Sequence, residues 1–283
     1  MKEYNEKTLK KVQQLELMIL KDFLSICNEN NLEYWGIAGT GIGAIRHGGF
    51  IPWDDDIDIA MPRKDFDILV NCFRTEFPDK YIVMNTDENP NFPLMTTRIM
   101  LKGTKFREYA LKNINCELGI FLDLYPHDKV SNNKKERNKQ FFKAWFFSKL
   151  LILRSIPFPV LGFKGSKAKI VHIICAIVHY LMSALHISKK WLALKCKEAC
   201  TVCNHYKNTK YIDFLCNTTP YKNLCKVSDI YPLKKIKFED IELNFPNNIH
   251  EDLVRVYGDY MQLPPIEKRK NHFPYELDFG KYK

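Results

Sequence analysis

The N-terminal segment, residues 6–28, has the hydrophobic spacing of an amphipathic helix. Its apolar residues recur in steps of three and four, at Leu9, Val12, Leu15, Ile19, Phe23 and Ile26. This spacing places them on one stripe of a helix. We therefore predict a helix that buries one face beneath a sheet.

Shorter apolar runs after this helix predict strands. They lie at residues 33–38, 57–61, 81–84, 94–100 and 119–126. Residues 63–73 predict a helix instead, because Phe66, Leu69, Val70 and Phe73 form one inner face. The early part of the chain thus alternates strands and helices around one core.

The last third of the chain returns to strand periodicity. Residues 235–238 and 241–245 alternate as a hairpin, and residues 249–257 predict a helix closed by Gly258. Residues 259–272 have no periodicity and carry basic residues after a double proline. Such a segment fits a lid over phosphates and equally fits a frayed surface tail.

Residues 131–200 differ from the rest of the chain in charge. They contain 14 Lys and Arg against Glu136 and Glu198, a local balance of +12, whereas the whole chain has a net charge of +10. Five aromatic residues lie between Phe141 and Phe147. Lysines interleaved with aromatic residues suit a helix at an anionic membrane surface. A soluble helical module with solvated lysines is the alternative.

Residues 170–188 contain no Asp, Glu, Lys or Arg and predict a long helix. This length approaches the roughly 20 residues that cross a bilayer. His172, His179 and His186 recur every seven residues and form a polar stripe with Ser183. The stripe favours a buried or interfacial helix over a spanning one. Histidines two turns apart are too distant to share one ion, so we interpret them as hydrogen-bonded residues.

The cysteines bear on the compartment and on one possible cofactor. Nine cysteines, an odd number, and a lysine-rich N-terminus without a secretory pattern predict reduced thiols in the cytoplasm. Cys196, Cys200 and Cys203 have the C-x3-C-x2-C spacing of an iron–sulfur loop. The same steps place small residues on one face of a helix, and the helical pattern of residues 191–200 favours structural thiols.

Four carboxylates lie within five residues, at Asp54, Asp55, Asp56 and Asp58. In an extended segment Asp54, Asp56 and Asp58 share one face. Acids on one face repel each other unless a cation lies between them, and carboxylate oxygens select a hard ion such as Mg²⁺ or Mn²⁺. Most acidic runs are solvated loops. Here the apolar pattern that follows, from Ile57 onward, favours a metal site.

Glycines precede the acids. Residues 39–43 contain three of them and predict a turn before a short helix that starts at Ala44, and the free N–H groups of such a turn suit phosphate. A dinucleotide-binding fold fits poorly. The spacing is not G-x-G-x-x-G, and Gly48, Gly49 and Pro52 leave no room for the crossover helix of that fold.

The segment from Gly39 to Asp58 resembles the signature of the LicD family, which contains bacterial phosphocholine transferases and has fukutin-type proteins as distant relatives. A second block, from Tyr257 to His272, resembles the family's C-terminal motif. The resemblance implies an α+β fold with a polymerase β-like nucleotidyltransferase mixed sheet and a helical insertion. We expect a catalytic core at 1–130, the basic, aromatic-rich insertion at 131–207, and a C-terminal hairpin, helix and basic lid at 208–283.

The resemblance also assigns residues. Asp56, Asp58 and Asp123 would be catalytic and would bind Mg²⁺ or Mn²⁺, with Asp54 as a further ligand. Gly39 and Thr40 would form the phosphate turn. Beyond these assignments, we also expect the substrate to be bound by Arg46, His47, Arg98, Arg269 and His272. For Arg98 a structural salt bridge is an equal alternative to a phosphate contact.

The implied activity is metal-dependent transfer of a phospho-alcohol from a CDP-linked donor to a glycan hydroxyl, with release of CMP. The acceptor would be a cell-surface glycan such as lipopolysaccharide or teichoic acid, or its lipid-linked precursor. Asp123 would help remove the acceptor's proton as the oxygen attacks phosphorus in line. Choline, glycerol and ribitol stay open as the alcohol, and Trp35, Trp53 and Tyr125 are candidates for an aromatic box.

The alternative function is a nucleotidyltransferase that acts on RNA or on a small molecule. The basic region alternates charge with bulky apolar residues, which argues against a groove for nucleic acid. A catalytically silent scaffold is disfavoured because all three acids are present. We therefore expect a cytoplasmic enzyme that is peripheral at the inner face of the membrane, with an anionic membrane surface as a partner and no nucleic acid.

Overall fold

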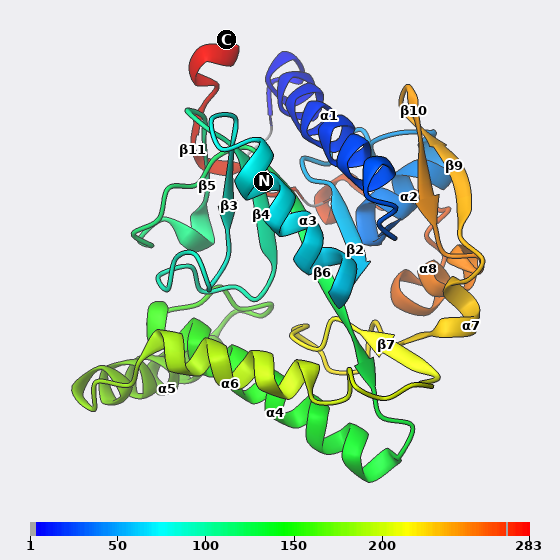
Figure 1. Cartoon of the computed structure of the whole chain (residues 1–283). Coiled ribbons are helices and arrows are strands. Elements are labelled where there is room, and N and C mark those ends of the chain that lie inside the picture. Colours follow the sequence, from blue (N-terminus) through cyan, green and yellow to red (C-terminus); the bar gives the residue numbers. More distant parts are fainter. Residues whose placement is uncertain (1–3, 270) are drawn as a thin grey trace.

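The computed structural model describes residues 4–269 and 271–283 as an α+β fold around a mixed sheet (Figure 1). The order of its main strands is β1 (Trp35–Gly36), β2 (Asp58–Pro62), β6 (Phe121–Val130), β4 (Thr97–Leu101) and β3 (Tyr81–Met84). β2 and β6 run parallel, and the other neighbours in this order run antiparallel. The predicted α+β class with a mixed sheet is therefore confirmed.

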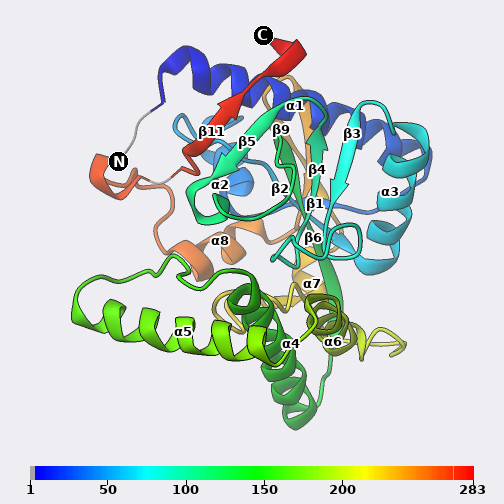
Figure 2. The ribbon, with the colours of Figure 1, turned by 90° about the vertical axis from the view of Figure 1, so that its left-hand side faces the viewer.

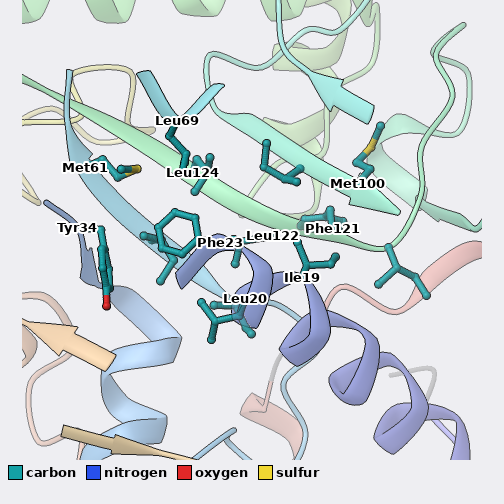
Figure 3. Packing of buried hydrophobic residues seen from close by; sticks show 14 of the residues in the cluster. Ile19, Leu20, Phe23, Tyr34, Met61, Leu69, Met100, Phe121, Leu122 and Leu124 are labelled. Atoms are coloured by element: carbon teal, nitrogen blue, oxygen red, sulfur yellow. The ribbon is translucent and has the colours of Figure 1, made fainter. Parts of the chain in front are cut away.

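Two helices cover one face of this sheet. α1 (Glu6–Glu29) contacts β4, β6 and α3 (Arg63–Glu76), and α3 contacts β2, β3 and β6. Figure 3 shows Ile19 and Phe23 of α1 near Leu122 and Leu124 of β6, all of them buried. The predicted N-terminal helix and its apolar stripe are thus confirmed.

The opposite face of the sheet carries acidic residues. Ile59 and Met61 belong to the helix-covered core, so the alternation of a strand turns Asp58 to the other side. Asp58 of β2 is the register partner of Asp123 of β6, and Arg98 of β4 is the register partner of Asp123. Three chain segments therefore place charged side chains side by side.

The predicted turn at residues 39–43 is wrong, because these residues lie inside helix α2 (Ala38–His47). The chain reverses at Ala38, whose φ is 49°. The glycines serve close packing: a Cβ on Gly43 would lie 2.3 Å from the carbonyl oxygen of Gly49. The N-terminus of α2 adjoins β2, where the N–H of Ile37 donates to the carbonyl of Asp58 at 3.1 Å.

A helical module lies below the sheet in Figure 1. It consists of α4 (Lys134–Ser155), α5 (Ser166–Ala184) and α6 (Lys189–Thr201). α4 packs against both α5 and α6, and α6 also contacts β6. The division into domains at 131–207 and 208–283 stays a prediction.

The C-terminal third completes the core from a distance in the sequence. Its elements are β7 (Tyr211–Asp213), β8 (Cys225–Lys226), α7 (Val227–Ile230), β9 (Lys234–Phe238), β10 (Ile241–Phe245), α8 (Ile249–Tyr257), η2 (Ile266–Lys268), β11 (Pro274–Asp278) and η3 (Gly280–Tyr282). β9 and β10 form the predicted hairpin, and α8 is the predicted helix. β11 pairs with β5 (Lys105–Glu108), which is followed by η1 (Tyr109–Leu111), as Figure 2 shows for the two strands. β7 extends the sheet by pairing with the far half of β6, and β8 pairs with β7.

Candidate active site

Asp58 and Asp123 form the centre of the candidate site. Both are buried, with 8% and 6% of their surface exposed. The N–H of Asp58 donates to Thr40 Oγ1 at 2.8 Å, which ties α2 to the start of β2. Asp58 Oδ1 is buried and has no hydrogen-bond partner among the described residues. A buried carboxylate oxygen without a partner is costly unless a cation occupies the site.

The acids of the cluster disfavour each other's ionisation. Burial raises the pKa of Asp58, and the charges of Asp56 and Asp123 raise it further. Burial likewise raises the pKa of Asp54, with Asp56 and Asp58 adding to the effect. The pKa of Asp123 is raised to about 6 by burial, against the opposing effect of Arg98. A divalent cation would relieve both the burial penalty and the repulsion, so the residues present fit Mg²⁺ or Mn²⁺.

Gly39 allows Asp54 to enter this cluster. A Cβ on Gly39 would lie 2.6 Å from Asp54 Oδ2, closer than any real contact of that kind. The carbonyl of Asp54 also accepts from Gln13 Nε2 at 2.9 Å, so α1 holds the same segment. Gly39 and Thr40 therefore shape the acid cluster directly, one by its small size and the other by the hydrogen bond to Asp58.

Asp55 was not among the predicted site residues, yet it anchors the C-terminal segment. Its side chain is fully buried and accepts from the Tyr4 hydroxyl at 2.6 Å and from the His272 N–H at 2.7 Å. The ring Nδ1 of His272 lies 3.2 Å from Asp56 Oδ2 and 3.4 Å from Asp55 Oδ1. The only sequence signal for this function was membership of Asp55 in the acidic run.

His272 is held as a cation by these acids. Burial acts to lower its pKa, but Asp56 and Asp55 outweigh it and raise the pKa to about 11. Asp55, Asp56 and His272 also place one ligand atom each within 4.8 Å of one another, a grouping that a metal ion could share. Because the imidazolium already pairs with Asp56, an ion and His272 would compete for that carboxylate.

Glu16 of α1 is a second acid that the sequence pattern did not reveal as part of the site. It is fully buried, and neither carboxylate oxygen has a hydrogen-bond partner within the described residues. Burial raises its pKa well above the usual range, and Asp56, Asp55 and Asp54 raise it further. Burial and the neighbouring acids therefore both favour the neutral form of the Glu16 carboxyl group.

Arg98 lies in the core beside the acids. Its guanidinium donates to Glu108 at 2.6 and 3.1 Å and to Asp123 Oδ1 at 3.4 Å, and it lies 3.8 Å from the ring centre of Phe121. Only 4% of the side chain is exposed. These contacts are consistent with a positioning role of Arg98 toward Asp123. They form the salt bridge that was the alternative interpretation of Arg98.

Arg46, His47 and Arg269 gather around Trp53. The guanidinium of Arg269 lies 4.2 Å from the centre of the Trp53 ring and that of Arg46 lies 6.0 Å away. The rings of His47 and Trp53 are 6.5 Å apart. Neither arginine has a carboxylate partner in the part of the chain that the structure describes; Arg46 donates to the carbonyl of Tyr260 and Arg269 to that of Pro264. Two guanidinium groups that lie close together and have no carboxylate partner among the described residues suit the binding of an anion.

A cavity of about 150 Å³ adjoins the acid cluster. Aromatic and charged side chains line it, among them Tyr125, Phe214 and Tyr257, together with Asp252 and Arg255, which pair at 2.6 Å. Tyr125 hydrogen-bonds with Asp58, and the rings of Tyr125 and Phe214 meet edge to face at 5.2 Å. Burial raises the pKa of Tyr257, and so do Asp58, Asp54 and Asp56, so this side chain also lies near the acids.

The predicted aromatic box is only partly assembled. Tyr125 lines the cavity, but Trp53 lies between the arginines and Trp35 is fully buried against His127. Phe214 and Tyr257 complete the aromatic lining instead. The sequence could not place Phe214 there, since Phe214 directly follows β7, a strand of only three residues.

The comparisons with known proteins agree with the resemblance in the motifs. The family model described as LicD/FKTN/FKRP, nucleotidyltransferase domain, matches residues 31–162. The chain is 29% identical to the lipopolysaccharide cholinephosphotransferase LicD of Haemophilus influenzae, over 94% of this chain and 96% of that protein. Uncharacterized proteins of Rickettsia prowazekii and Rickettsia typhi are 45% identical over 47 residues, 17% of this chain and 18% and 15% of theirs. The predicted resemblance is thereby confirmed: residues 31–162 match the model of the LicD family.

Proposed function

We propose that this chain transfers phosphocholine from CDP-choline to a hydroxyl of a cell-surface glycan or of its lipid-linked precursor. The observation that carries the proposal is the pairing of Asp58 and Asp123 on parallel strands, with a buried oxygen of Asp58 left unpartnered. The similarity to a lipopolysaccharide cholinephosphotransferase over nearly the whole chain supports the transferred group and the acceptor class.

Asp56, Asp58 and Asp123 would hold Mg²⁺ or Mn²⁺, with Asp54 beside them. When bound, the ion neutralises negative charge on the donor's diphosphate. The unpartnered Asp58 oxygen and the raised pKa values of Asp54, Asp58 and Asp123 support this assignment. The polymerase β-like nucleotidyltransferase fold is part of the same proposal.

Asp123 would act as the general base. The acceptor oxygen forms a bond to the choline-bearing phosphorus while the bond from that phosphorus to the bridging oxygen breaks. CMP leaves with the bridging oxygen, and the acceptor proton passes to Asp123. The pKa of Asp123, raised to about 6 in the metal-free chain, would fall when the ion binds, so the carboxylate would be in its charged, proton-accepting form. Arg98 holds this carboxylate in place through its 3.4 Å contact.

The arginines around Trp53 would bind the phosphates of the donor. Arg46 extends from the C-terminal end of α2, and Arg269 comes from the irregular segment before His272. Asp55 ties that segment to the acid cluster through the His272 N–H. The segment would therefore serve as the basic lid, with His272 and His47 at its margins.

The cavity beside Asp58 would take the choline head group. A quaternary ammonium ion is attracted to aromatic rings and to carboxylates. Tyr125, Phe214 and Tyr257 supply the rings, and Asp252 supplies a carboxylate whose Oδ1 pairs with Arg255 at 2.6 Å and whose other oxygen would face the head group. An uncharged glycerol or ribitol group gains little from that combination, so the lining favours choline.

We place the enzyme at the cytoplasmic face of the membrane, docked through α5. Its outward residues are apolar, each between 54% and 61% exposed, at Ile170, Ile173, Ile174, Ile177, Tyr180 and Leu181, and Leu185 directly after the helix is 63% exposed. Among the described helices, α5 alone has a length and composition sufficient to cross a membrane, and 11% of that window is buried. A contiguous apolar surface of this kind marks an interaction site.

The polar stripe of α5 faces the protein rather than the solvent. His172 Nε2 lies 2.9 Å from the carbonyl of Pro159, and His179 Nδ1 lies 2.7 Å from that of Leu153. His186 follows the end of the helix, so only two of the three histidines belong to the predicted stripe. A helix that turns its polar side inward and its apolar side outward suits a lipid surface, and Lys164, Lys167 and Lys169 at its start would meet anionic head groups.

We propose no nucleic acid as a partner of this chain. The basic residues of the helical module lie among exposed apolar residues such as Phe142 and Phe146, which are 61% and 40% exposed. Such a surface suits lipid better than a phosphate backbone.

A donor panel tests the chemistry. The purified chain is incubated with Mg²⁺, a glycan acceptor and either CDP-choline, CDP-glycerol, CDP-ribitol or CTP. We expect CMP from CDP-choline and phosphocholine on the acceptor, both absent with Asp58→Asn. Pyrophosphate from CTP, with no CMP from any CDP-alcohol, would contradict the proposal and favour a nucleotidyltransferase.

A further inference from the structure

Three cysteines from two segments that are distant in the sequence lie close together in the structure. Cys196 and Cys200 lie one turn apart on α6, and Cys216 lies in the turn after β7. Cys216 Sγ is 3.3 Å from Cys196 Sγ and 3.5 Å from Cys200 Sγ, and all three sulfur atoms lie within 4.8 Å of one another. Cys203, the third member of the sequence motif, is not part of this group, so the iron–sulfur spacing is not assembled.

We propose that Cys196, Cys200 and Cys216 form a binding site for a soft metal ion, with Zn²⁺ as the ligand of first choice. Tetrahedral zinc with Zn–S bonds of about 2.3 Å separates its sulfur ligands by roughly 3.8 Å. The Cys216 sulfur needs to move away from the other two by only a few tenths of an ångström to reach this separation. Cys196 and Cys200 are buried and Cys216 is partly exposed, so a water molecule as the fourth ligand would approach from the side of Cys216.

Positive charge lies close to the thiols. Burial lowers the pKa of Lys149 on α4, and Cys216 and Cys196 are the groups that oppose this effect. Lys149 has no ion-pair partner in the described part of the chain. Zinc with three thiolates carries one net negative charge, so the ammonium group of Lys149 would balance the site.

The site connects the helical module to the wall of the cavity. Phe214 and Asn217 line the cavity and lie on either side of Cys216 in the sequence. Cys196 also contacts the carbonyl of Ala144 on α4 at 3.3 Å. A bound ion would therefore fix the Phe214 turn against α4 and α6 and hold the cavity wall in one position.

Metal content and cobalt spectroscopy test this site without measuring transferase activity. The whole chain is expressed with added zinc, and zinc is quantified before and after chelation. The matched variants are Cys216→Ser and Cys203→Ser, the latter a buried cysteine outside the group. We expect one zinc per wild-type chain and per Cys203→Ser chain, and an affinity lower by roughly 100-fold or more in Cys216→Ser. Replacement by Co²⁺ should give intense thiolate-to-cobalt charge-transfer absorption in the wild type and in Cys203→Ser only.

Three results would overturn the proposal. The first is a wild-type chain that binds neither zinc nor cobalt. The second is zinc that Cys216→Ser retains at full affinity, since that ion would sit elsewhere, for instance on the acid cluster. The third is a disulfide between Cys216 and Cys196 or Cys200 in the freshly isolated chain, detected by peptide mass spectrometry. Because the cobalt spectrum is measured on the wild type, a variant that fails to fold does not decide the outcome.

Discussion

The main-chain N–H of His272 donates a hydrogen bond to Asp55 Oδ1 at 2.7 Å, and this contact joins the C-terminal segment to the acidic run. The other oxygen of Asp55 accepts from the Tyr4 hydroxyl at 2.6 Å. One fully buried side chain thus holds the start of the chain, the end of the chain and the acid cluster together.

Asp55→Ala should therefore release the C-terminal segment. It leaves the Tyr4 hydroxyl and the His272 N–H without their acceptor, which costs about 1–3 kcal/mol for each donor that stays buried. We expect lower stability in urea, faster proteolysis within residues 259–273 and lower transferase activity. Tyr4→Phe is the matched control, because it removes one donor and should leave the segment protected. Unchanged proteolysis in Asp55→Ala would show that other contacts hold the segment.

Asp58→Asn and Asp56→Asn should each abolish turnover while leaving the chain folded. Burial and neighbouring acids raise the pKa of Asp58, so its charge destabilises the metal-free chain. Both variants should unfold in EDTA at the same temperature as the wild type or higher, whereas added Mg²⁺ should stabilise only the wild type. Full activity of either variant at saturating Mg²⁺ would refute the metal assignment.

The head-group cavity predicts a change in donor preference. Tyr257→Leu keeps an apolar side chain but removes its aromatic face, which contributes about 1 kcal/mol to the binding of a cation. We expect KM for CDP-choline to rise about fivefold, the fold-change of that energy. Asp252→Asn should act in the same direction. The measurement is kcat/KM for CDP-choline relative to CDP-glycerol, and an unchanged ratio in both variants would place the choline elsewhere.

Stability against acid should depend on His127. Burial lowers its pKa to about 4, whereas the unfolded chain titrates at the usual value of about 6.5. Between these values the unfolded state binds more protons, so falling pH removes stability, by about 3 kcal/mol in total. We expect His127→Gln to be less stable than the wild type at pH 7 and to lose less stability between pH 7 and pH 4. Parallel unfolding curves across this range would show that His127 does not titrate there.

The parts of the fold that the sequence predicted well are those with strong local periodicity. α1, α8 and the hairpin β9–β10 follow the predicted ranges closely, because each buries one regular stripe or face. β7 and β8 have three and two residues, too few for any periodic signal, and β11 pairs with β5 only through the tertiary fold. The turn predicted at residues 39–43 failed because those glycines serve helix packing rather than chain reversal.

The residues of the candidate site were likewise predicted only where the local sequence carried a signal. Asp58 and Asp123 lie side by side, as expected for acids on adjacent strands. Glu16 looked like an ordinary polar position on an amphipathic helix, and Cys216 was an isolated cysteine in a loop. Both acquire a possible function only when distant segments meet, and no local pattern reports such contacts. The assignment of the substrate-binding residues stays a prediction.

The last prediction concerns the membrane surface. Each lysine near an anionic leaflet contributes about 1 kcal/mol, and the apolar face of α5 adds burial in the interface. Ile173→Ser combined with Ile177→Ser removes two outward residues that are 59% and 60% exposed, whereas Ile68→Ser removes an apolar residue on α3 that is 38% exposed. We expect the wild type and Ile68→Ser to sediment with phosphatidylglycerol vesicles at low salt, and the α5 double variant to remain in solution. Binding that weakens with salt supports surface docking, and a salt-resistant pellet indicates insertion of α5. The isoleucines of α5 point outward, so some partner must cover them. If the wild-type chain does not bind anionic vesicles and instead forms a dimer in solution, a second copy of the chain covers this face.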